Sequence, residues 1–275
     1  MNQRETLRIN EKGNLEIGNI DCTALVEKYG TPLYVFDKSY IENMCRVYSD
    51  TLKTEYGDGL ICYASKAFSC KDIYRTVNSC NVGADVVSGG ELFTALSVDF
   101  PSEKICFHGN NKTFDELVYA VDNKVGYIVI DSHSEAEILN KICLDKGVIQ
   151  QVLIRINPGV EAHTHEFIQT ATVDSKFGFS INSGEAQEII EFVNGKSNLN
   201  LVGLHCHIGS QIFEMQSFSL AVEKMTDFYK HLKQELNIEF DVLNLGGGFG
   251  IYYSYGDDKK SCDEYADYIK VISKT

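Results

Sequence analysis

A single lysine follows a short apolar run in the segment CYASKAF, residues 62–68. Burying an ammonium group without a partner is costly. Lys66 therefore either emerges into solvent at the end of a strand or reaches into a site that needs an amine. This segment alone favours the solvated strand end, so the other residues that could do chemistry must decide.

Three consecutive glycines, Gly246 to Gly248, form the segment NLGGGFG with their neighbours. Residues without a Cβ atom let several backbone N–H groups approach one anion, and phosphate is the natural guest. The spacing is not that of a P-loop, and Ile251 stands where a dinucleotide-binding pattern needs its last glycine. The run predicts either a different kind of phosphate site or a flexible turn.

Two histidines, His205 and His207, lie two residues apart in HCHIGSQ and would share one face of a strand. One interpretation is a metal-dependent hydrolase. A second makes His207 a flat ring that stacks on a planar cofactor, with Gly209 and Ser210 donating to its phosphate. The third is a pair of buried histidines bonded to neighbouring strands.

Charged residues also fall inside two apolar runs. Asp85 in GADVVSGGEL and Arg155 in VLIRIN are expensive to bury unless each is paired. For Asp85 we expect His205, His207 or Lys66 as the partner, and for Arg155 an anion. The long polar loop before DSKFG (174–178) is expected to contact substrate.

These residues need a scaffold that gathers strand ends, and the chain alternates apolar runs with helical patterns. This alternation predicts a parallel sheet covered by helices. Polar residues at nearly every run's end favour a (β/α)₈ barrel over an open sheet. Only seven such strands are present, so one strand is missing. The runs are 60–65, 83–88, 104–109, 126–131, 151–157, 201–208 and 241–248.

Local signals add detail to this α/β prediction. Thr113 with Glu116, and Ser134 with Glu137, have the spacing of capping boxes that open helices. A hairpin with its turn at residues 12–14 is expected near the N-terminus. We therefore expect an N-terminal β arm over residues 1–35 and an incomplete barrel over 36–275.

Composition narrows the possible partners. The 275-residue chain has a formal charge of −14, which argues against nucleic acid. No window approaches the roughly 18 apolar residues of a membrane span, and the first residues do not form a secretory signal. Nine cysteines without a C-x-x-C pair indicate reduced thiols. The expected location is the cytoplasm.

Together, an amine, a flat ring, an arginine, an interior aspartate and a phosphate site at one barrel mouth match pyridoxal 5′-phosphate. A lysine forms a Schiff base with its aldehyde. A metal site is not expected in this interpretation.

The motifs YASKAF, DVVSGGEL, FHGNNKT, GLHCHIGSQI and NLGGGFGIYY, in this order, resemble the pyridoxal-phosphate decarboxylases with an alanine-racemase-like barrel. Within them the likeness is greatest to the enzymes acting on diaminopimelate. The segment around HTHEFIQT points the same way, although Ala171 replaces the usual glycine. The resemblance covers about residues 31–253.

The resemblance implies site roles. Lys66 would be the Schiff-base lysine and His207 the ring that stacks on the pyridine. Ser210 and Gly246, Gly247 and Gly248 would hold the phosphate, with Asp85 and Arg155 close to the cofactor.

It also implies a reaction: decarboxylation of meso-diaminopimelate to L-lysine by a homodimer. Alternatives are a decarboxylase of ornithine, arginine or a carboxylated polyamine, or a non-catalytic pyridoxal-phosphate-binding barrel. The family's eighth strand, with its E-P-G-R segment, and its C-terminal β domain are not found. We therefore expect this chain alone to be nearly inactive.

Overall fold

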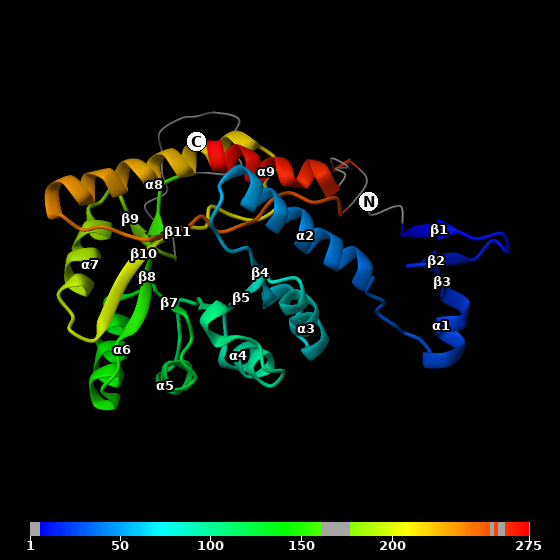
Figure 1. The fold of residues 1–275 in the computed structure, drawn as a ribbon, viewed down its shortest axis with the longest axis horizontal. Coiled ribbons are helices and arrows are strands. Elements are labelled where there is room, and N and C mark those ends of the chain that lie inside the picture. The colour runs from blue at the N-terminus through cyan, green and yellow to red at the C-terminus, as the bar shows by residue number, and fades with distance from the viewer. Residues whose placement is uncertain (1–5, 161–176, 254–255, 258–261, 275) are drawn as a thin grey trace.

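A curled parallel β-sheet with helices on its outer side forms the centre of the chain (Figure 1). The computed structural model describes residues 6–160, 177–253, 256–257 and 262–274. Each strand is followed by a return segment that is mostly helical, which is why all neighbouring strands of the main sheet run parallel. The alternation predicted from the sequence is confirmed.

All seven strands predicted from the sequence are present. Five are shorter than predicted, and the two predicted at 151–157 and 201–208 begin earlier, at Gln150 and Leu199. The seven strands are ordered β11-β10-β8-β7-β6-β5-β4, and a two-residue strand, β9 (Phe179–Ser180), pairs beside β8. The seven are β4 (Cys62–Ala64), β5 (Gly83–Val86), β6 (Ile105–Phe107), β7 (Tyr127–Ile130), β8 (Gln150–Asn157), β10 (Leu199–His205) and β11 (Val242–Asn244).

The sheet does not close. Within the described part of the chain, β4 and β11 each have a neighbour on one side only. The expectation of a barrel that is one strand short is therefore confirmed.

The helices lie on the outer side of the sheet and across its ends (Figure 1). Two 3₁₀ turns interrupt the pattern, η1 (Ser65–Ala67) and η2 (Ser102–Lys104). The helices are α2 (Lys38–Glu55), α3 (Lys71–Ser79), α4 (Gly89–Leu96), α5 (Phe114–Asp122), α6 (His133–Lys146), α7 (Glu185–Asn194), α8 (Met215–Leu236) and α9 (Cys262–Lys274). None of the helices over the described ranges is long and apolar enough to cross a bilayer.

One of the two predicted capping boxes is confirmed and the other is wrong. Thr113 and Glu116 cap α5 reciprocally. In α6 the N-cap is Ser132, whose hydroxyl accepts from the Glu135 N–H, so Ser134 is already inside the helix. The helix begins earlier because the Ser132 hydroxyl caps it, while Asp131, between Ser132 and the end of β7, accepts from the Gly178 N–H.

Two separate apolar layers follow from the alternation of side chains along each strand. The larger lies between sheet and helices and contains Ile105, Phe107, Ile154 and Leu204. The smaller contains Cys106, Val129, Leu153 and Val202, the strand residues that point to the opposite, inner face. Polar residues at the C-terminal ends of the same inner rows lie at the mouth of the sheet.

The N-terminal hairpin is confirmed. Strands β1 (Leu7–Ile9) and β2 (Leu15–Ile17) pair antiparallel, and β3 (Ile20–Asp21) and α1 (Cys22–Tyr29) follow. Gly13 takes a φ of 78°, which the turn requires. Figure 1 shows this arm at one end of the molecule, away from the sheet. The boundary at residue 35 stays a prediction.

The last helix, α9, packs against α2 and α8. Its Tyr268 is fully buried and stacks on Phe249, with ring centroids 4.6 Å apart. Phe218 of α8 completes the contact, 4.9 Å from the Phe249 ring. The end of the glycine segment is therefore attached to three helices at once, because Tyr48 of α2 also stacks on Phe249.

Candidate active site

Strand register brings the candidate residues to one level of the sheet. Ala64, Asp85 and Cys106 are aligned across β4, β5 and β6. Arg155, His205 and Asn244 are aligned in the same way across β8, β10 and β11. All are at or near the C-terminal ends of parallel strands, where α/β folds build their sites.

Lys66 lies in η1, two residues beyond the aligned Ala64. The turn is fixed by its neighbour Ser65, which is fully buried. The Ser65 hydroxyl is 2.8 Å from the Asp85 carbonyl oxygen and 3.1 Å from the Glu91 carboxylate. Lys66 itself is exposed. A rigid turn therefore holds an accessible amine at the mouth of the sheet.

A second lysine near the mouth shows the contrast. The side chain of Lys112 is 1% exposed, and its amine lies 2.7 Å from the Glu135 carboxylate. The same amine donates to the carbonyls of Gly109 and Val129. Its hydrogen-bonding capacity is used inside the fold, so Lys112 ties the loop before α5 to β7 and α6 rather than facing a ligand. No sequence signal distinguished it from a surface lysine.

His207 is the centre of the candidate site. Burial, and next the charge of Lys66, lower the pKa of its imidazole to about 4. Arg155 and His108 act in the same direction, while Asp85 opposes them. Charges act over several ångströms, so these four residues lie in the neighbourhood of His207. At neutral pH His207 is therefore an uncharged flat ring.

The glycine run lies against this ring. A Cβ at Gly246 would be 3.1 Å from His207 Nδ1, and one at Gly248 would be 3.3 Å from His207 Cε1. A Cβ at Gly247 would meet no atom within 4 Å. The run therefore packs on His207 through its outer members and faces open space through the middle one.

Ser210 belongs to the segment that pairs with the glycine run. Ile212 forms an isolated parallel bridge with Phe249, and its N–H donates to the Gly248 carbonyl at 3.0 Å. Gln211 also bonds both backbone groups of Ile251. Ser210 is exposed beside this bridge. The pairing explains why two segments 40 residues apart form one loop cluster.

The predicted partners of Asp85 are wrong. Its ion-pair contact is His108 Nε2, 3.2 Å from Asp85 Oδ1. His108 comes from the end of the neighbouring strand β6 and points to the same inner face as Asp85, which explains the choice. In the sequence, the only indication that His108 could contact Asp85 was its position at the end of a strand.

Arg155 meets the expected anion. Its guanidinium is 3.9 Å from Asp131 Oδ2 and lies over the Phe177 ring at 4.4 Å. Asp131 also accepts from the Gly178 N–H at 2.6 Å. Burial raises the pKa of Asp131 and lowers that of Arg155. Most of the predicted substrate loop (157–172), including Ala171, lies in residues 161–172, outside the described residues.

The two histidines of HCHIGSQ do not behave alike. β10 ends at His205, so His207 lies in the following loop. His205 is buried, its ring contacts that of His108 edge-on at 4.5 Å, and burial lowers its pKa far below the usual range. Among the described residues, neither His205 nor His207 belongs to a cluster of three metal-ligating side chains. The geometry does not favour the hydrolase interpretation.

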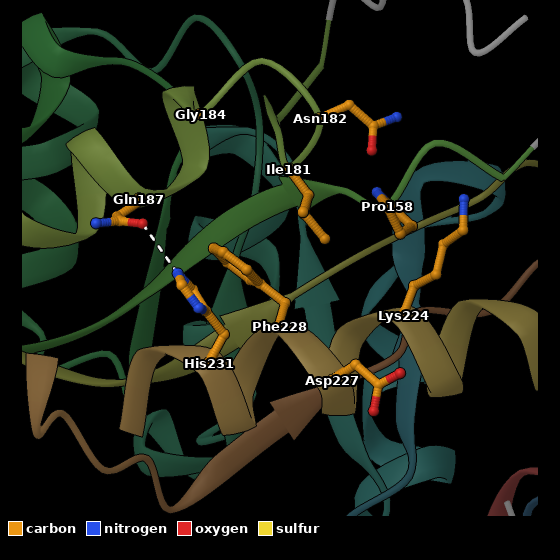
Figure 2. A pocket seen from close by; sticks show the side chains of 9 residues that line it. All are labelled: Pro158, Ile181, Asn182, Gly184, Gln187, Lys224, Asp227, Phe228 and His231. Carbon is orange, nitrogen blue, oxygen red and sulfur yellow. Dashed lines mark hydrogen bonds between the residues drawn. The ribbon is translucent and has the colours of Figure 1, made fainter. Parts of the chain in front are cut away.

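A cavity of about 370 Å³ lies elsewhere, between α7 and α8 (Figure 2). Figure 2 shows His231 bonded to Gln187, at 3.2 Å. None of the candidate residues at the strand ends lines it. Its lining is Pro158, Ile181, Asn182, Gly184, Gln187, Lys224, Asp227, Phe228 and His231.

The residues at the mouth fit a pyridoxal cofactor. An accessible amine suits its aldehyde, and an uncharged ring suits its pyridine face. The open space beside Gly247 suits a phosphate approached by backbone N–H groups. Each of the three features has a counterpart on the cofactor.

Comparison with known proteins agrees. Residues 41–274 match the family described as "Pyridoxal-dependent decarboxylase, pyridoxal binding domain". A diaminopimelate decarboxylase from Bacillus methanolicus is 44% identical over 260 residues, 94% of this chain and 60% of its own length. One from Bacillus subtilis is 43% identical, over 96% of this chain and 60% of its own.

A solved structure gives the same result. The diaminopimelate decarboxylase of M. jannaschii in complex with L-lysine is 36% identical, with a TM-score of 0.88. The match covers 100% of this chain and 64% of that chain. The barrel of alanine-racemase type expected from the sequence is confirmed, and so is pyridoxal 5′-phosphate as the cofactor. The chain spans about 60% of the length of these relatives, and it belongs to the pyridoxal-dependent decarboxylase family.

Proposed function

We propose that the strand-end site takes part in decarboxylating meso-diaminopimelate to L-lysine. Several relatives 42–44% identical to the chain are named diaminopimelate decarboxylase. A neighbour with a TM-score of 0.88 was solved with L-lysine. The observation that carries the proposal is the convergence of Lys66, His207 and the open glycine cradle on one edge of the sheet.

In this proposal Lys66 attaches the cofactor aldehyde. The turn that holds it is fixed through Ser65 to Asp85 and Glu91, so the amine returns to the same place in each cycle. The nearby buried Lys112 cannot replace it, because its amine already has three oxygen partners.

His207 would stack on the pyridine face. Its lowered pKa, about 4, keeps the ring uncharged at neutral pH, so it adds no second cation beside Lys66. The glycine run packs against the same ring through Gly246 and Gly248.

Gly246, Gly247 and Gly248, with Ser210, would bind the phosphate. Backbone N–H groups donate to an anion without a bulky side chain in between. The Gly246 N–H already donates to the Asn244 side-chain oxygen at 2.9 Å, so Gly246 would shape the loop while Gly247 and Gly248 would offer the N–H groups.

Asp85 and Arg155 would bound the cofactor on the remaining sides. Arg155 already pairs with Asp131, so it contributes a fixed positive charge rather than a mobile one. When bound, pyridoxal phosphate supplies a ring that accepts the electron pair left by carbon dioxide. The chain orients the scissile bond and keeps the ring in place.

Partners follow from the same proposal. The proposed substrate is a small amino acid. The proposal also includes a homodimer and a cytoplasmic location. The formal charge of −14 makes nucleic acid a poor ligand.

A covalent label tests the site. The chain is loaded with pyridoxal phosphate, reduced with borohydride and mapped by peptide mass. We expect the label on Lys66 and none on Lys71, an exposed lysine of α3 that serves as the matched control. Label on another lysine with Lys66 unmodified contradicts the assignment.

The reaction is tested in a longer protein, with this chain joined to the C-terminal part of the Bacillus methanolicus relative. We expect carbon dioxide and lysine in equal amounts from meso-diaminopimelate. Lys66→Ala should lower the rate at least a thousandfold, and Lys71→Ala should not change it. Faster release from ornithine or arginine contradicts the substrate, and bound cofactor without release favours a non-catalytic barrel.

A further inference from the structure

A compact group of metal-ligating side chains lies at the ends of β5 and β6. Asp85, Cys106 and His108 each offer one ligand atom, and these atoms all lie within 4.8 Å of one another. Asp85 and Cys106 are register partners, and His108 is two residues beyond Cys106 on the same inner face. The cluster is a product of strand pairing and not of a flexible loop.

Burial sets this cluster apart from ordinary surface groups. Cys106 is 3% exposed and the His108 side chain 9%. Asp85 Oδ1 and His108 Nε2 are buried and 3.2 Å apart, yet neither forms a hydrogen bond in the part of the chain that the structure describes. Such orphaned buried polar atoms are rare in folded proteins. The two atoms form an ion-pair contact, and the Cys106 thiol lies within 4.8 Å of both.

We propose that Asp85, Cys106 and His108 bind a zinc-class divalent cation beneath the cofactor site. A thiolate, an imidazole and a carboxylate form a donor set that suits Zn²⁺ and does not suit Mg²⁺ or Ca²⁺. Binding replaces the thiol proton of Cys106, which leaves to solvent, while His108 and Asp85 donate lone pairs. Three protein ligands leave a fourth position open to water.

The distances are compatible with such a site. Bonds of 2.0–2.3 Å in a tetrahedron place ligand atoms about 3.3–3.8 Å apart. The 3.2 Å contact between Asp85 and His108 is already close to this range. The other distances between the ligand atoms are all below 4.8 Å. They reach the range of a tetrahedral site if side-chain rotation moves the atoms by about 1 Å. Asn244 interacts with the Cys106 thiol, and this interaction would be lost when the thiolate binds the metal.

A metal ion in this cluster is expected to change cofactor binding. This consequence rests on the proposed function, whereas the metal site does not depend on that proposal. Asp85 acts on His207 above as well as on His108 below. A bound cation would neutralise the Asp85 charge that faces the cofactor site. We therefore expect the affinity for pyridoxal phosphate to differ between the chain with and without bound zinc.

Cobalt is the probe, because Co²⁺ bound to a thiolate gives an intense near-ultraviolet charge-transfer band that Zn²⁺ does not. The 275-residue chain, treated with chelator, is titrated with CoCl₂ with and without pyridoxal phosphate. We expect one equivalent to produce the band and ZnCl₂ to remove it. Cys106→Ala should abolish the band. Cys143→Ala, a buried cysteine of α6 outside the cluster, should retain it.

His108→Gln provides a second variant in case Cys106→Ala fails to fold, which far-ultraviolet circular dichroism reports. It should weaken cobalt binding at least tenfold with the fold intact. No charge-transfer band in the unmodified chain, or a band that survives in both variants, overturns the metal site. Failure of the longer protein, in which this chain is joined to the C-terminal part of the relative, to bind pyridoxal phosphate would overturn the proposed function and leave the cobalt result unaffected.

Discussion

At the residue scale, the three glycines of NLGGGFG are not equivalent. Gly246 has a φ of 68°, and a Cβ there would be 2.5 Å from the Cys206 carbonyl oxygen. Gly248 has a φ of 100°, and its Cβ would collide with the Gly209 carbonyl. The fold itself thus requires both. Gly247 has no left-handed φ and open space around its missing Cβ. A ligand that must approach the backbone closely explains this third glycine.

The variant Gly247→Val tests whether a glycine is needed at this position for ligand binding or for folding. We expect its free energy of unfolding to change little, because the new side chain enters open space. Its affinity for pyridoxal phosphate should fall roughly a hundredfold, the loss of one or two charge-assisted hydrogen bonds. Fluorescence titration and urea unfolding measure the two quantities. Gly248→Ala is the control that should lose stability, and unchanged affinity in folded Gly247→Val would show that the run is only a turn.

His207 makes stability depend on pH. Its folded pKa is about 4, below the usual 6.5, because burial and the Lys66 charge disfavour the protonated ring. Between these values the unfolded chain binds the proton and the folded chain does not, so this contribution to stability is lost as pH falls from 6.5 to 4.

The size of this loss in the free energy of unfolding follows from the difference between the folded and unfolded pKa values of His207. Unfolding by urea at pH 7 and pH 4.5 should show the unmodified chain losing roughly 2 kcal/mol more than His207→Gln. His231→Gln, which removes an exposed histidine, should behave like the unmodified chain. Equal losses in His207→Gln and the unmodified chain would show that the imidazole is solvated.

At the element scale, the cradle depends on helices far from it in sequence. Phe249 closes the glycine segment and inserts among Phe218 of α8, Tyr268 of α9 and Tyr48 of α2. The Tyr268 hydroxyl donates to the Ile212 carbonyl at 3.3 Å, on the segment that carries Ser210. Both halves of the proposed phosphate site are therefore anchored to the same aromatic group.

Tyr268 is the point at which to test this anchoring. Tyr268→Ala should cost about 3–5 kcal/mol of stability and also weaken cofactor binding, because Phe249 loses its stacking partner. Tyr268→Phe keeps the ring and should cost only about 1 kcal/mol. Calorimetry and cofactor titration provide the readouts. If Tyr268→Ala binds the cofactor normally, the aromatic group stabilises the fold without supporting the site.

The sequence indicated which residues lie at strand ends, but it did not indicate which strands are neighbours in the sheet. Lys66, His207 and the glycines were selected because together, at strand ends, they match a pyridoxal cofactor, although each alone is compatible with an ordinary strand end or turn. The Asp85–His108 contact depends on which strands are neighbours, and a chain of seven similar runs does not specify this locally. The helix start at Ser132 was missed because Ser134 offers the same spacing two residues later.

At the scale of the whole molecule, the sheet is curled but open. Within the described ranges, no strand pairs with the outer edge of β4 or β11. Leu60 and Leu243, beside and in these edge strands, are about 40% exposed, at 42% and 39%. Unpaired edges with apolar side chains promote association between chains. The relatives that match this chain extend well beyond the matched part, which is about 60% of their length.

Joining the chain to the remaining C-terminal part of the Bacillus methanolicus relative tests what the open edges cost. If that part supplies a strand between β11 and β4, the edges become paired and the apolar side chains beside them become covered. We expect a higher free energy of unfolding, less concentration-dependent association and tighter cofactor binding, all in the same protein. Urea unfolding, sedimentation and fluorescence titration measure these three quantities. A matched fusion to an unrelated soluble domain should leave them unchanged. Cofactor affinity equal in the chain and in the longer protein would mean that the described strand ends form the complete binding site by themselves.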